Sequence, residues 1–276
     1  MITIGSYNEL VVERVVDFGV YLNPKADEVL LPLKYVPENT RPGDTLRVFV
    51  YTDSQDRPVA TTLSPKAVVG EFAYLQVIAV TSFGAFLDWG LEKDLLVPTS
   101  EQQSRMKVGE KYVVKVCLDE KSRRVYATSQ IARNCEKTAP DLAIGQKVNL
   151  LIYGLSGIGV MAVVNSRYPG ILYKSETYEP LAIGEITEGY VSKIREDGKI
   201  DLVLKKPGHQ SIADSGAGIL ETLQKRGGFI PCHDRSAPTE IQRIFSMSKK
   251  EFKRSIGGLY KAGKIDITDK GIRIKP

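Results

Sequence analysis

The stretch Val80-Thr81-Ser82-Phe83-Gly84-Ala85-Phe86-Leu87 decides the fold, because its pattern occurs three times in the chain. Residues 16–22 read Val-Asp-Phe-Gly-Val-Tyr-Leu, and residues 155–162 read Leu-Ser-Gly-Ile-Gly-Val-Met-Ala. In each copy a glycine interrupts a strand-like run, as it does where a strand must bend or bulge. Such self-similarity indicates tandem structural units.

A second glycine follows each motif at a nearly constant distance. The separation is 24 residues in the first copy and 25 in the other two, and the second glycines are Gly43, Gly109 and Gly184. After each second glycine an alternating strand, a polar turn and a further strand complete the unit. The predicted strands are 46–51 and 58–63, then 112–118 and 125–129, then 186–194 and 199–204. Each unit therefore has about five short strands, the number in a small closed barrel of the OB type.

The second unit resembles the S-one domain, an OB-fold repeat that binds RNA. The first unit matches this family less closely, and the third matches it least. The segments that carry the resemblance are Phe83-Gly84-Ala85-Phe86-Leu87, Leu95-Leu96-Val97-Pro98, Val108-Gly109-Glu110, Val114-Lys115-Val116 and residues 123–129.

The resemblance implies that the two aromatic residues around each motif glycine face the nucleic acid. These are Phe83 and Phe86 in the second unit, and Phe18 and Tyr21 in the first. An exposed ring offers a face on which a base stacks, whatever the sequence. The alternative is that these rings belong to the barrel cores, where most phenylalanines of small barrels lie.

The third unit has Ile158 and Met161 at the same two places, so the stacking surface is lost there. We expect this unit to act as a spacer or as a contact for a protein partner, with Tyr173 on its next strand as a partial replacement. The family often has a histidine on that strand, whereas this chain has Pro32 and Pro98 in its first two units. This difference weakens the inference of a binding site from the family resemblance, but it does not affect the inference of the fold.

Basic residues near the closing turn of each barrel are candidates for phosphate contacts. They are Arg57 in the first unit, Arg123 and Arg124 in the second, and Arg195 in the third. The alternative for all four is a solvated turn.

The apolar period changes from two to about 3.6 after residue 206, which indicates helices. The predicted elements are a helix ending at Arg226, an extended piece at 229–231, a helix from Pro238 to Phe245, a helix from Ser248 to Ala262, and a hairpin of 264–268 with 271–274. Ser248 and Glu251 form a capping-box pattern, in which the hydroxyl and the carboxylate each satisfy a free backbone N–H. Three helices and a hairpin in this order predict a winged helix-turn-helix, whose third helix commonly enters a groove of DNA.

Positive charge is concentrated in this C-terminal part of the chain. Residues 205–276 carry 15 Lys and Arg against 7 Asp and Glu, whereas residues 1–204 carry 23 against 26. The predicted nucleic-acid contacts are Lys249, Lys250, Lys253, Arg254 and Lys261 on the third helix, with Lys264 and Arg273 on the wing. These side chains suit phosphates. The alternative is that the module docks on the barrels or on another protein.

Three S-one-like barrels followed by a basic winged helix resemble the bacterial conserved virulence factor B family of RNA-binding regulators. The most specific segment runs from Gly227 to Tyr260 and includes Met247-Ser248-Lys249-Lys250-Glu251-Phe252-Lys253-Arg254. The resemblance implies a cytoplasmic protein that binds RNA and takes part in the control of gene expression.

Several classes of protein are disfavoured by what the sequence lacks. There is no apolar run long enough to span a bilayer, no secretory signal at residues 1–10, and no P-loop. The three cysteines and two histidines, Cys117, Cys135, Cys232, His209 and His233, lack the spacing of a zinc site. We therefore expect no metal and no cofactor, with a metal-dependent nuclease as the remaining enzymatic alternative.

The sequence thus predicts a mainly β chain of four domains, with OB-fold barrels at 1–64, 70–133 and 144–206 and a winged helix at 212–276. The favoured function is non-enzymatic binding of single-stranded RNA by base stacking and phosphate contacts. The alternatives are a DNA-binding transcription regulator that acts through the winged helix and a protein-interaction adaptor. No membrane partner is expected.

Overall fold

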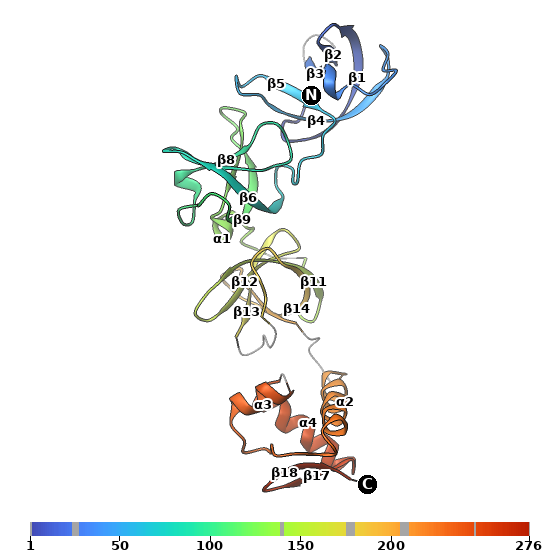
Figure 1. Ribbon diagram of the computed structural model, residues 1–276, viewed down its shortest axis with the longest axis vertical. Helices are drawn as coiled ribbons and strands as arrows, with labels where there is room; N and C mark the ends of the chain where they lie inside the picture. The colour runs from blue at the N-terminus through green and yellow to red at the C-terminus, as the bar shows by residue number, and fades with distance from the viewer. Residues whose placement is uncertain are drawn as a thin grey trace. The chain divides into compact units, whose positions relative to one another are not determined.

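The computed structural model describes residues 2–23, 28–138, 141–174, 180–204, 210–245 and 247–275. Three five-stranded β structures precede a winged helix (Figure 1), which confirms the predicted fold class. The chain divides into two compact units, Met1–Asn134 and Cys135–Pro276. Residues 205–209, which include His209 and lie at the junction of the predicted third barrel and winged helix, are outside the described residues.

The first barrel is closed, with strand order β1-β2-β3-β5-β4. Its strands are β1 (Ser6–Val16), β2 (Gly19–Leu22), β3 (Val29–Pro32), β4 (Thr45–Thr52) and β5 (Pro58–Thr61). All neighbours are antiparallel except β3 and β5, which close the barrel in parallel. Buried aliphatic side chains such as Leu22, Leu31 and Val48 fill its interior.

The second barrel has the same strand succession, but its hydrogen-bonded sheet is open, with order β10-β9-β6-β7-β8. The strands are β6 (Phe72–Val80), β7 (Gly84–Leu87), β8 (Leu95–Pro98), β9 (Lys111–Leu118) and β10 (Val125–Thr128), followed by the short α1 (Ile131–Asn134). The edge strands β8 and β10 lie beside each other without a backbone ladder among the described residues. Trp89 is buried against Phe49 of the first barrel and donates from its indole nitrogen to the Ala67 carbonyl at 2.7 Å.

The third barrel, in the second unit, is closed with order β11-β12-β13-β15-β14. Its strands are β11 (Lys147–Leu155), β12 (Gly159–Val164), β13 (Tyr168–Tyr173), β14 (Ile186–Ile194) and β15 (Ile200–Val203). Here too the closing pair, β13 with β15, is parallel.

Each barrel needs a glycine at the motif position for the same physical reason. A Cβ atom on Gly19, Gly84 or Gly159 would lie 2.2–2.5 Å from a carbonyl oxygen of the facing strand, which no side chain permits. The strand before each glycine is also bulged: the pairing of β1, β6 and β11 with the next strand shifts by one residue. A bulge followed by a close strand approach gives the sharp coiling that a five-stranded barrel needs.

The C-terminal domain is built from α2 (Gln210–Lys225), β16 (Phe229–Ile230), α3 (Pro238–Phe245), α4 (Lys249–Lys261), β17 (Ile265–Thr268) and β18 (Gly271–Ile274). Its three strands form a sheet of order β16-β18-β17 beside the three helices. Phe252 and Ile256 of α4 pack in its core with Ile219, Leu223 and Ile241.

The predicted capping box is only half formed. Ser248 Oγ accepts from the Glu251 amide at 3.1 Å, as expected. The Glu251 carboxylate instead accepts from Ser215 Oγ of α2 at 2.6 Å. This carboxylate therefore joins two helices rather than closing its own.

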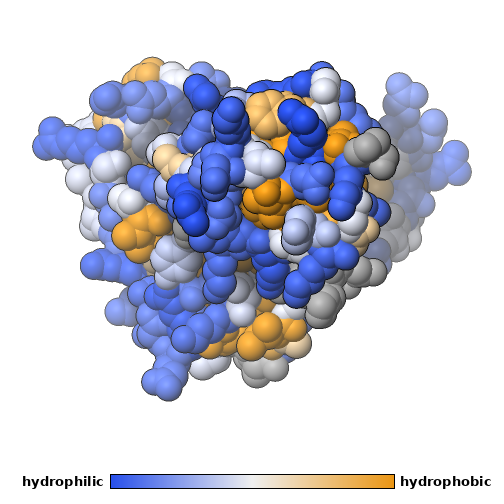
Figure 2. Space-filling model, turned by 90° about the horizontal axis from the view of Figure 1, so that it is seen from below, coloured by the Kyte–Doolittle hydropathy of each residue, from blue (hydrophilic) through white to orange (hydrophobic). Residues whose placement is uncertain are grey.

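The face drawn in Figure 2 is covered largely by hydrophilic residues, and its hydrophobic residues lie in small separate patches. Within the described ranges, no helix combines the length and apolar character that crossing a membrane requires.

Candidate nucleic-acid interface

The aromatic pair of the second barrel lies on the surface rather than in the core. Phe83 is 59% exposed and Phe86 is half-buried. The two rings meet edge to face, with centroids 5.7 Å apart and planes at 89°. Because Gly84 has no side chain, β8 approaches closely and Pro98 pairs directly with it. Phe83 thus offers a free ring face, while Phe86 holds it from the side.

The first barrel repeats this arrangement with a cation added. Phe18 is 57% exposed, and its ring meets that of Tyr21 edge to face at 6.2 Å. The Arg14 guanidinium lies 4.0 Å from the centre of the Tyr21 ring and is held by Glu28. One face of Tyr21 is therefore occupied, and Phe18 is the more accessible ring.

The third barrel presents aliphatic side chains at the corresponding place. Ile158 is 64% exposed, and Leu155 beside it is 59% exposed. Tyr173 pairs with Gly159, the position that Pro32 and Pro98 hold in the other two barrels. The Arg195 guanidinium contacts the Tyr173 hydroxyl and lies 5.8 Å from its ring. Tyr173 is therefore an aromatic group fixed by a cation rather than a free platform.

The arginines predicted to contact phosphates differ in how much of their charge is available. Arg57 forms an ion pair with Asp53 at 2.8 Å, and Arg195 forms one with Asp201 at 2.7 Å. The Arg123 side chain is exposed and has no hydrogen-bond or ion-pair partner among the described residues. A phosphate reaches Arg57 or Arg195 only in competition with a carboxylate, whereas Arg123 is free to receive one.

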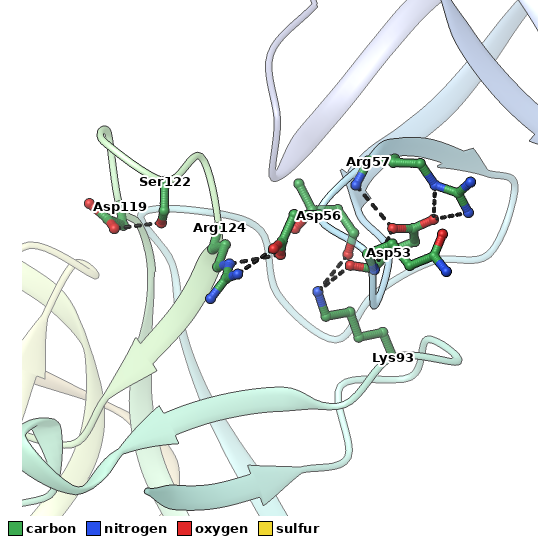
Figure 3. Close-up of polar contacts among 9 residues, drawn as sticks. Asp53, Asp56, Arg57, Lys93, Asp119, Ser122 and Arg124 are labelled. Carbon is green, nitrogen blue, oxygen red and sulfur yellow. Dashed lines mark hydrogen bonds and ion pairs between the residues drawn. The ribbon is translucent and has the colours of Figure 1, made fainter.

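Arg124 belongs to a polar network that joins the first two barrels within the first unit (Figure 3). Two of its guanidinium nitrogens donate to the Asp56 carboxylate, Nε to Oδ1 at 2.7 Å and Nη2 to Oδ2. Lys93 donates to the carbonyl oxygens of Thr52 and Asp53 at 2.8 and 2.7 Å. The Arg124 hydrogen bond lowers the pKa of Asp56, and burial lowers the pKa of Lys93. These residues fix the turn after β4 against the second barrel.

This network forms one side of a cavity of about 1020 Å³, which Phe83 and Phe86 also line. Two cations, Lys93 and Arg124, face it. The carboxylates that line it are Asp53, Asp56, Glu92, Asp94, Glu101 and Asp119. Four of these carboxylates have a side-chain partner. The pairs are Asp53 with Arg57, Asp56 with Arg124, Glu92 with Lys34, and Asp119 with Ser122. The aromatic surface of the second barrel therefore borders an acidic cavity.

The basic residues of α4 lie on its solvent-facing side. Lys250, Lys253, Arg254 and Lys261 are exposed, and helical periodicity places them outside the buried stripe of Phe252, Ile256 and Leu259. Among the described residues, the only ion pair of these four cations is a long one, between Lys253 Nζ and Asp234 Oδ2 at 4.0 Å. Lys249 is different, because its ammonium donates to the Arg235 carbonyl at 3.3 Å.

The wing contributes less free charge. Lys264 is exposed at the start of the hairpin. The Arg273 guanidinium lies over the Phe229 ring at 5.5 Å, so it is held above the β16–β18 pair. Lys264 lines one surface pocket with Lys253, Arg254 and Lys261 of α4, and these four cations form the cationic face of the domain.

Sequence reasoning missed Arg14, Lys93, Asp94 and Tyr260. The Arg14–Tyr21 contact depends on the bulge in β1, and the contacts of Lys93 join segments about 40 residues apart. Tyr260 extends the cationic face with an aromatic ring that is 55% exposed. Its signal was available, since position 260 falls outside the apolar period of α4.

No set of three or more His, Cys, Asp or Glu side chains in the described part of the chain is placed to hold a metal ion. The acidic lining of the cavity is thus spread along its walls.

Comparison with known proteins agrees with this architecture. The S1 domain family, the S-one family of the sequence resemblance, matches residues 4–63 and 69–129. The CvfB-like winged helix domain family matches residues 217–274. Conserved virulence factor B of Staphylococcus epidermidis is 26% identical over 243 residues, which cover 83% of this chain and 82% of that protein. The chain contains two S1 domains and a CvfB-like winged helix domain, and it is similar to conserved virulence factor B proteins over most of its length.

Two further proteins match the chain over nearly its whole length. The uncharacterized protein YitL of Bacillus subtilis is 28% identical over 268 residues, covering 95% of this chain and 90% of YitL. A crystal structure of a multidomain protein with nucleic acid binding domains from Streptococcus pneumoniae is 25% identical and covers 99% of this chain and 98% of that one, with a TM-score of 0.43. The S1 and winged-helix domains support a nucleic-acid-binding role for the chain, and neither is a family of enzymes.

Proposed function

We propose that this protein binds single-stranded RNA without catalysis and regulates gene expression in the cytoplasm. The observation that carries the proposal is the exposed Phe83 ring, supported from the side by Phe86. A core residue would not expose an aromatic ring to water in this way, whereas a base that stacks on it removes both surfaces from water.

In this proposal the second barrel provides the main stacking site, with Phe83 and Phe86, and the first barrel adds Phe18 and Tyr21. Tyr173 of the third barrel contributes little, because Arg195 holds it. Arg123 is the foremost phosphate contact of the barrels, and Arg57 and Arg124 serve as contacts only when their carboxylate partners are displaced.

The winged helix supplies the electrostatic part of binding. The proposed phosphate contacts are Lys249, Lys250, Lys253, Arg254, Lys261, Lys264 and Arg273. Linking this face to the barrels in one chain raises the effective concentration of each for the same RNA strand.

A salt titration tests the proposal. Fluorescent single-stranded RNA and duplex DNA of equal length are titrated with the full chain at several salt concentrations. We expect preference for RNA, with an affinity that falls steeply as salt rises, because phosphate contacts release counterions. Preference for the duplex would transfer the function to the winged helix.

The exposed cations of α4 favour duplex DNA as the second candidate ligand. In that case charge reversal at Lys253 and Arg254 abolishes DNA binding, and the barrels serve as a scaffold. Absence of binding to either nucleic acid would leave a protein adaptor, with Ile158 and Leu155 of the third barrel as its first candidate contacts. Incubation of RNA with Mg²⁺ or Mn²⁺ tests for cleavage.

A further inference from the structure

The cavity beside Phe83 has a charge that opposes the phosphate backbone. Six carboxylates and two cations line it, and both cations are committed to protein acceptors, Arg124 to Asp56 and Lys93 to backbone carbonyls. A phosphate that entered would meet net negative charge with no free donor from these cations. The cavity is nevertheless open beside the exposed ring on which a base would stack.

Two of the six carboxylates differ from the other four in lacking a polar partner among the described residues. The Asp94 and Glu101 side chains make no hydrogen bond and no ion pair with any residue that the structure describes. Burial, with Asp88 nearby, raises the pKa of Asp94, so its carboxylate is partly deprived of water. A carboxylate in this state gains from a ligand that donates hydrogen bonds to it.

Nucleobases differ in the donors that they supply. Cytosine, adenine and guanine carry an exocyclic amino group, and a carboxylate accepts from the amino group of cytosine in known recognition. Uracil has no amino group: its one edge donor, the N3 imino N–H, lies between two carbonyl oxygens that repel a carboxylate. Single-stranded RNA exposes these edges because its bases can be splayed out.

We propose that the cavity lined by Phe83, Asp94 and Glu101 is a base-reading pocket, which accepts amino-bearing bases and discriminates against uracil. This inference rests on the proposed function, since a base must first reach the Phe83 ring. The backbone stays outside the acidic lining and meets cations elsewhere on the chain. The carboxylates thus give selectivity that stacking alone does not provide.

The test compares two pairs of single-stranded oligoribonucleotides about 12 nucleotides long, within the range of OB-fold site sizes. The first pair is oligo(C) and oligo(U). The second is oligo(A) and the same oligomer of purine riboside, which lacks only the amino group. For the parent we expect oligo(C) to bind about tenfold more tightly than oligo(U), and oligo(A) to exceed its amino-free analogue similarly.

The variant D94N/E101Q should bring both ratios close to one, because each amide offers donors as well as an acceptor. The control E38Q removes one charge from an exposed site outside the cavity and should leave the ratios unchanged. Circular dichroism and thermal unfolding establish that each variant is folded. If the double variant is not folded, the single variants D94N and E101Q are used in its place. Each of them should lower both affinity ratios.

Ratios near one in the parent, or ratios that survive both carboxylate substitutions, overturn the base-reading pocket. The variant F83A/F86A separates this failure from failure of the proposed function. If it weakens binding of every oligomer while the parent shows no base preference, the stacking site stands and only the pocket is wrong. If it binds every oligomer like the parent, the stacking site is wrong and the pocket falls with it.

Discussion

The second barrel and the winged helix offer a nucleic acid opposite kinds of surface. The barrel exposes the Phe83 ring beside an acidic cavity whose two cations are already paired. On α4 the cations Lys250, Lys253 and Lys261 are exposed and share one side. The first surface suits bases, and the second suits phosphates.

This difference implies that affinity and salt dependence arise in different parts of the chain. Stacking is short-ranged and responds weakly to salt, whereas each neutralised phosphate adds to the slope of affinity against salt. The two quantities can therefore be changed separately by mutation.

The largest effect is expected from F83A/F86A. Loss of the stacking surface should cost about 1–3 kcal/mol for each base that it holds, with little change in the salt slope. Fluorescence anisotropy with single-stranded RNA at several salt concentrations measures both quantities. Ile158→Ala, at the matching place in the third barrel, is the control and should change affinity much less. A large change of the salt slope in F83A/F86A would contradict the assignment of base stacking to the barrel and of phosphate contacts to α4.

Neutralising α4 should have the reverse signature. K253Q/R254Q removes two exposed cations, and each lost phosphate contact should reduce the salt slope by about 0.7 on a single strand. Affinity should fall about tenfold at low salt and converge with that of the parent at high salt. K225Q on α2, whose lysine is paired with Glu221, is the matched control. An unchanged slope would show that α4 does not meet the backbone.

The repeats were predictable from sequence because their cause is local. A Cβ at Gly19, Gly84 or Gly159 would collide with a backbone carbonyl, so the requirement is written in single residues at fixed offsets. The winged helix was predictable for a similar reason, since helix periods, stops and the Ser248 cap are short-range signals.

The acidic cavity was not predictable, because it depends on contacts between distant residues. Asp56 and Arg124 are 68 positions apart, and the two barrels bring them together. A basic residue after a turn looks the same in sequence whether a phosphate or a carboxylate receives it. The open sheet of the second barrel was missed for the same reason, since the relation of β8 to β10 is a tertiary one.

A smaller effect is expected when Arg124 is released from its carboxylate. D56N removes the partner and should raise affinity for single-stranded RNA about threefold at low salt, since one more cation faces the strand. The hydrogen bond from Arg124 lowers the pKa of Asp56, so the pair holds at neutral pH and is lost only as pH falls through that lowered value. Binding by the parent should therefore show no rise of this origin between about pH 6 and pH 8.

In D56N, Arg124 of the second barrel would then contact phosphate in addition to the cations of α4. Its salt slope should steepen slightly, and combining it with R124Q should return the affinity to that of the parent or below. An affinity that falls in D56N alone would mean that the network supports the stacking site through its structure rather than by withholding a cation.

The smallest effect concerns Gly257, which lies between the cations of α4. It falls on the side shared by Lys250, Lys253 and Lys261, and a Cβ added there would meet no atom within 4 Å. A glycine inside a helix costs about 1 kcal/mol relative to alanine, so Gly257→Ala should raise the free energy of unfolding by up to that amount. If a phosphate backbone approaches this side closely, the same methyl group should weaken RNA binding two- to threefold, about 0.4–0.7 kcal/mol.

Gly218→Ala provides the matched control, because Gly218 is exposed on α2 and a Cβ there also meets nothing within 4 Å. Thermal unfolding should show both variants stabilised, whereas anisotropy should show weaker RNA binding for Gly257→Ala alone. The opposite signs matter, because a variant that is more stable and binds less cannot have lost binding through misfolding. Equal binding by both variants would mean that the cations of α4 reach phosphates at the ends of their side chains and that the helix backbone stays clear of the strand.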